Sequence, residues 1–166
     1  AGLDQVDRGL EYEEELELDA AEASFQRAVD LDPNWGPASE GLERVRATRT
    51  KMQFDSRMSE GLDALQAGDY LGARKRYARV IERSDEPMFA PYLQRSLSRL
   101  IEIAIYTRDF RDIDGYFNRL DALPSPALTV TTAYFRAKYL YNRAVPVDEI
   151  LNAPPDATLE IGPIPS

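Results

Sequence analysis

The chain has 166 residues, a formal net charge of −9 at pH 7, no cysteine and no histidine. These absences exclude disulfide bonds and thiolate metal sites, and they remove the side chain used most often as a general base or metal ligand near neutral pH. No run of about 18 or more apolar residues is present, so no segment is a candidate for a membrane-spanning helix. We therefore expect no metal, no cofactor and no small-molecule substrate.

The first 35 residues predict two helices, over residues 2–14 and 18–31. Apolar residues recur at helical spacing in both. In the first helix they are Leu3, Val6 and Leu10, and in the second Leu18, Ala21, Phe25, Ala28, Val29 and Leu31. Asp19 is followed three residues later by Glu22, which is capping-box spacing, so we expect the second helix to begin near Asp19.

The net charge is concentrated in this first segment. Residues 1–35 hold eleven acidic residues against two arginines, whereas the acids and bases of the remaining chain are equal in number. The favoured interpretation is a solvated helix face at an exposed end. The alternative is an electrostatic docking face for a basic partner.

A long helical segment follows the turn at residues 34–37. Trp35 is expected to pack over the end of the first hairpin. No proline occurs between Ala38 and Ala67, so this interval is either one helix of about 30 residues or two helices with a break near residues 50–55. A basic turn within it is expected to pair with the acidic first hairpin or to be solvated rather than to contact nucleic acid, since no aromatic residues are interleaved with it. This turn consists of Arg44, Arg46, Arg49 and Lys51.

The remaining segments continue the hairpin pattern. Gly61, Ala73, Tyr77 and Val80 repeat Gly9, Ala21, Phe25 and Ala28 at one constant offset of 52 residues. A third hairpin is predicted over residues 88–122, where Asp109, Phe110 and Phe117 repeat Asp69, Tyr70 and Tyr77 at an offset of 40. One more helix is predicted over residues 126–143. Five of the eleven prolines follow Val145, so we expect residues 144–166 to be an extended or disordered tail.

The spacing of the first hairpin resembles the 34-residue tetratricopeptide signature. The residues that carry the resemblance are Gly9, Tyr12, Ala21, Phe25, Ala28 and Pro33. The resemblance implies an all-α solenoid of antiparallel helix hairpins. Its expected segments are a first acidic hairpin (residues 1–35), a long helix with a second hairpin (36–85), a degenerate third hairpin with a terminal helix (86–143) and the tail (144–166).

Membership of this family implies a groove lined by positions 2, 5, 9 and 12 of each repeat. On this chain the groove candidates are Leu3, Val6, Leu10, Glu13, Asp55, Met58, Leu62 and Leu65 and, less securely matched, Arg95, Ser98, Glu102 and Ile105. The alternative is that the apolar members are core residues. The lysine and asparagine residues that clamp a carboxylate tail in chaperone-docking members are absent, where Val6, Leu10, Met58 and Leu62 stand. A co-chaperone role is therefore not expected.

These features of the sequence allow three functions. The first is a non-catalytic scaffold or adaptor that binds a peptide or helix of another protein. The second is a structural subunit of a larger assembly, of cell-envelope or secretion type, whose groove is permanently filled. An enzyme is a remote third, because the carboxylates of residues 13–17 point to different sides of a helix. Only three of the 20 basic residues are lysines, which indicates a bacterial source. We expect a soluble chain in the cytoplasm or periplasm.

Overall fold

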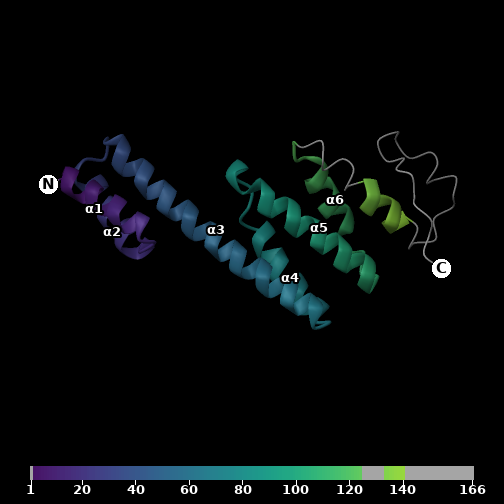
Figure 1. Ribbon diagram of the computed structural model, residues 1–166. Helices are drawn as coiled ribbons and strands as arrows, with labels where there is room; N and C mark the ends of the chain where they lie inside the picture. The colour runs from purple at the N-terminus through teal and green to yellow at the C-terminus, as the bar shows by residue number, and fades with distance from the viewer. Residues whose placement is uncertain (1, 125–132, 141–166) are drawn as a thin grey trace. The chain divides into compact units, whose positions relative to one another are not determined.

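A computed structural model of the chain describes residues 2–124 and 133–140, and its secondary structure there is entirely helical (Figure 1). The elements are α1 (Gly2–Glu14), α2 (Leu18–Leu31), α3 (Gly36–Gln66), α4 (Tyr70–Ile81), the 3-10 turn η1 (Pro87–Phe89), α5 (Ala90–Thr107), α6 (Ile113–Asp121) and helical residues 133–140. The predicted all-α fold of helical hairpins is confirmed. The chain divides into two compact units, Ala1–Ser56 and Arg57–Ser166, which are described separately.

Helix α3 is one continuous helix of 31 residues. The alternative of a break near residues 50–55 is wrong, because that interval contains neither proline nor glycine to interrupt the hydrogen-bond ladder. At 1.5 Å per residue the helix is about 46 Å long. The predicted tail and most of the predicted helix over residues 126–143 lie outside the described residues.

The first unit is built around the ring of Phe25. Helices α1 and α2 form an antiparallel hairpin, and the beginning of α3 completes the core. A Cβ atom on Gly9 would lie 2.8 Å from the Phe25 ring, and one on Gly41 would lie 2.4 Å from it. Both positions must therefore be glycine for α1 and α3 to approach the ring. The buried residues of this core are Val6, Leu18, Ala21, Phe25, Ala28, Ala38, Leu42 and Val45.

Helix α2 begins at Leu18, as predicted, but its capping differs from the prediction. Its N-cap is Glu17, whose side chain makes no capping hydrogen bond, so the predicted capping box of Asp19 and Glu22 does not form. Burial of Leu18 in the core extends the helix one residue before Asp19, and Glu22 is bound to arginines of α3. Trp35 packs on the first-unit core as predicted, with its ring 3.1 Å from the Cβ position of Gly2.

The second unit repeats the same contact with different residues. A Cβ atom on Gly61, near the end of α3, would lie 2.8 Å from the ring of Tyr77 in α4. Helix α5 packs against both α4 and α6 (Figure 1). Tyr139 lies with its ring centre 5.2 Å from that of Phe110 and 5.9 Å from that of Phe117. Residues 133–140 thus pack on the third hairpin and extend its core.

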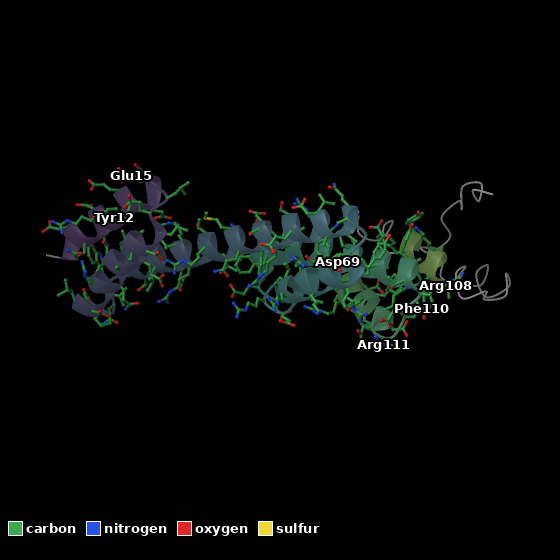
Figure 2. The ribbon with its side chains drawn as sticks, turned by 90° about the horizontal axis from the view of Figure 1, so that it is seen from below. Tyr12, Glu15, Asp69, Arg108, Phe110 and Arg111 are labelled. Atoms are coloured by element: carbon green, nitrogen blue, oxygen red, sulfur yellow. The ribbon has the colours of Figure 1, made fainter. Side chains whose placement is uncertain are left out.

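Three turns carry a left-handed residue at corresponding positions. Leu16 has φ 59°, Gly68 has φ 77° and Arg108 has φ 56°. They stand at the same offsets of 52 and 40 residues that relate the helices. Only the glycine adopts this backbone without steric cost. Figure 2 labels Asp69 beside the second of these turns and Arg108 at the third.

Candidate functional site

The groove candidates of the first unit divide into exposed and packed side chains. Leu3 is 67% exposed and Leu10 is 41% exposed, whereas Val6 is buried in the core. Glu13 is partly covered and accepts an ion pair from Arg44 of α3 at 2.9 Å. Asp55, on α3, is exposed. The two leucines are therefore the apolar candidates of this unit that face solvent.

In the second unit the α3 candidates separate in the same way. Leu62 is 41% exposed, while Met58 and Leu65 are half-buried against the second-unit core. Leu10 and Leu62 stand 52 residues apart, at equivalent positions of the first two hairpins, and are exposed to the same extent. Each directly follows the glycine that accommodates the aromatic ring. The repeat therefore places an exposed leucine directly after a glycine that packs on an aromatic ring in both units.

The α5 candidates are mostly polar. Arg95 is exposed, Ser98 donates its hydroxyl to the Gln94 carbonyl at 2.9 Å, and Glu102 accepts from Arg99 at 2.8 Å. Ile105 is buried in the core. This helix therefore offers charged and hydroxyl groups where the first two hairpins offer leucine.

The Tyr77 hydroxyl lies close to one groove candidate of α3 and is influenced by the charge of another on α5. It lies 3.5 Å from the carbonyl oxygen of Met58. Burial raises the pKa of Tyr77, and the charges of Arg99 and Glu102 act on that pKa in opposite directions. The Tyr77 hydroxyl therefore lies beside α3, and its pKa responds to charges carried by α5.

The basic turn of α3 forms ion pairs with the acidic first hairpin. Of the two predicted alternatives, pairing and solvation, the structure confirms pairing. Arg44 pairs with Glu13, Arg46 pairs with Glu22 at 3.0 Å, and Arg49 pairs with both Asp19 and Glu22. The hydrogen bond from Arg46, together with Arg49, holds the pKa of Glu22 below its ordinary value. These arginines therefore contribute to joining α3 to α1 and α2.

A second ion-pair network was not predicted from the sequence. Arg74 of α4 binds Asp109 and Asp112, each at 2.6 Å, and Arg111 binds Asp109 at 2.7 Å. Hydrogen bonds from Arg111 and then Arg74 lower the pKa of Asp109 well below its usual range. Arg74 lies 35 positions before Asp109 and 38 before Asp112, so no local spacing indicates its pairing with them. The network fastens α4 to the α5–α6 turn (Figure 2 labels Phe110 and Arg111 there).

An aromatic pair is a further feature that the sequence analysis did not single out. The rings of Tyr70 and Tyr106 are 5.2 Å apart, and Tyr106 is 71% exposed. Loss of water contact raises the pKa of Tyr70, and Tyr106 adds to the shift. The pair adds exposed aromatic surface at the end of α5.

Among residues 2–124 and 133–140, no group of three or more histidine, cysteine, aspartate or glutamate side chains is placed to hold a metal ion. None of the helices in this described part combines the length and apolar character needed to cross a bilayer. Comparisons with protein-family models, curated proteins and solved structures found no match.

Proposed function

We propose that this chain is a non-catalytic scaffold that binds a peptide or helix of another protein, and that its hairpins are tetratricopeptide-like repeats. The observation that carries the proposal is the pair of equivalent leucines, Leu10 and Leu62, each 41% exposed. Helical packing buries apolar side chains where it can, so an exposed leucine repeated at one position is available for a partner.

The backbone gives the repeat part of the proposal independent support. In both of the first two hairpins an aromatic ring packs on a glycine 16 residues before it. The left-handed turn residue recurs in all three hairpins at the same offsets as the helices. These shared features are a turn conformation and a close helix contact, which are properties of a repeating structural unit.

The test is affinity capture from native cell extract with a double variant, Leu10→Glu with Leu62→Glu. The matched control carries the same two changes at exposed leucines of the partner helices, Leu31→Glu in α2 and Leu71→Glu in α4. We expect the first variant, but not the control, to lose a specific protein while both keep wild-type helicity by circular dichroism. Equal capture by the two variants contradicts the proposal.

The same experiment addresses the alternative of a permanently built-in subunit. A scaffold exchanges its partner on dilution, so purified partner should dissociate and rebind within minutes. A subunit of a fixed assembly copurifies in constant stoichiometry and does not exchange. Exchange measured with a labelled second copy of the captured protein separates the two.

A further inference from the structure

The solvent side of α1 combines leucines with carboxylates. Leu3, Asp7, Leu10 and Glu14 follow one another at spacings of four, three and four residues, which places them on one side of a helix. Glu11 borders this row, and all five side chains are exposed. We call these five residues the acidic leucine face. Apolar side chains flanked by charge are the pattern of an interaction surface rather than of a purely solubilising one.

Internal ion pairs sort the acids of the first hairpin into two groups. Glu13, Asp19 and Glu22 are bound to the arginines of α3. The three carboxylates of the acidic leucine face form no ion pair with any residue that the structure describes. The negative charge left uncompensated by the fold therefore includes these three groups, beside Leu3 and Leu10.

We propose that the acidic leucine face binds a basic amphipathic helix of a partner protein, an inference that rests on the proposed scaffold function. Leu3 and Leu10 are seven residues apart, which is the repeat at which one helix presents side chains to another. Lysine or arginine residues that flank the partner's apolar stripe complement Asp7, Glu11 and Glu14. Nucleic acids and anionic membranes are repelled by the same carboxylates.

The partner helix is represented by three synthetic peptides of 18 residues. The first has leucines at helical spacing flanked by lysines, the second has the same composition in shuffled order, and the third has glutamate in place of lysine. Binding to the full chain is measured by fluorescence anisotropy at low and at physiological salt. We expect the first peptide to bind at least tenfold more tightly than the shuffled one and to gain helical circular dichroism on binding. The third peptide should not bind.

Paired variants assign the site. Leu3→Ser with Leu10→Ser should weaken binding of the first peptide at least fivefold, and the change leaves the charge untouched. Leu31→Ser with Leu71→Ser removes two exposed leucines elsewhere and should leave the affinity unchanged. All four side chains are exposed, so folding should be retained, as circular dichroism will check.

Three outcomes overturn the inference: no binding of the first peptide, equal binding of the shuffled peptide, or no effect of the Leu3 and Leu10 changes. Equal binding of the shuffled peptide would mean attraction by net charge alone. If capture from extract depends on Leu10 and Leu62 while the peptides fail to bind, the scaffold stands and this inference falls. If the first peptide binds through Leu3 and Leu10 while capture from extract is unchanged in the Leu10→Glu, Leu62→Glu variant, the proposed function falls and the acidic leucine face still binds a basic helix.

Discussion

The first hairpin, α1 with α2, and the second, formed by the end of α3 with α4, pack through the same contact but close their turns differently. Each places an aromatic ring on a glycine, Phe25 on Gly9 and Tyr77 on Gly61. The second turn has a glycine at its left-handed residue and a capping aspartate, Asp69, which accepts a hydrogen bond from the Gly72 amide at 2.8 Å. The first has Leu16 and Glu17 there, with no side-chain cap.

The difference shows which interactions fix the conformation of each hairpin. The second turn is favoured by its own residues, since glycine and aspartate suit a left-handed turn and a helix start. The first turn is unfavourable locally, and its helices are held by contacts made elsewhere. These contacts are the Phe25 core and the ion pairs from α3. Five changes test this reading.

The largest effect is expected from Phe25→Ala. The ring is fully buried between two glycines that have no side chains to fill the space, so the cavity cannot collapse easily. We expect a loss of about 3–5 kcal/mol. Hydrogen exchange should show the loss of protection concentrated in α1 and α2. Equal loss in α5 and α6 would contradict a local role for this core.

The next effect is expected from Gly41→Ala. The added Cβ would lie 2.4 Å from the Phe25 ring, which is buried and cannot move aside freely. Overpacking costs about 1–3 kcal/mol, which outweighs the gain of about 1 kcal/mol in helix propensity. Urea denaturation should show net destabilisation. The matched control is Gly115→Ala in α6, where nothing lies within 4 Å of the added atom, and the same substitution should stabilise the protein.

Asp69→Ala removes the cap of α4. Loss of an N-cap hydrogen bond costs about 1 kcal/mol. The same change at Glu17, whose side chain makes no capping bond, should have little effect on thermal stability. If Glu17→Ala proved as costly as Asp69→Ala, the two turns would not differ in the way described.

Leu16→Gly should stabilise the first hairpin. The leucine is 65% exposed and its backbone is left-handed, so glycine relieves the strain while little burial is lost. We expect a gain of up to about 1 kcal/mol, measured by the midpoint of thermal unfolding. The reverse change, Gly68→Ala, places a side chain at φ 77° and should destabilise by a similar amount. No change in either variant would mean that these turns carry no strain.

The smallest effect is expected from Glu22→Gln, measured as a change in the pH dependence of stability. Because the pKa of Glu22 is lowered in the folded chain, its contribution is fully present above the ordinary value of 4.5 and is lost as the pH falls through the folded pKa. Glu22→Gln should therefore show a shallower loss of stability between pH 5 and pH 3 than the wild type. An unchanged slope in the Glu22→Gln variant would contradict this contribution of Glu22.

The helical architecture was predictable from residues that act locally or recur. The offset of 52 between Gly9 and Gly61 and between Phe25 and Tyr77 identified the repeat. The contact of each ring with its glycine was not predicted and is seen only in the structure. The absence of a capping box at Asp19 was not predicted, since burial of Leu18 in the core outweighed the capping preference of Asp19.

The candidate surface was predictable only in part. Helical periodicity places Val6 and Leu10 on the same apolar side of α1. It does not reveal that Val6 is buried and Leu10 exposed, because that depends on how α2 and α3 pack. The pairing of Arg74 with Asp109 likewise depends on the path of the chain between them. The ion pairs between α3 and the first hairpin could be predicted, because the basic turn of α3 and the acidic hairpin carry charges of opposite sign.

The continuity of α3 has a consequence for proteolysis. Boundaries between compact units usually lie in open linkers, where proteases cut first. Here the boundary between Ser56 and Arg57 lies inside a 31-residue helix, whose backbone does not fit a protease cleft until it unwinds locally. Limited digestion of the native chain should therefore leave residues 50–60 intact while the hairpin turns are cut, and isolated halves will have to be produced by truncating the gene.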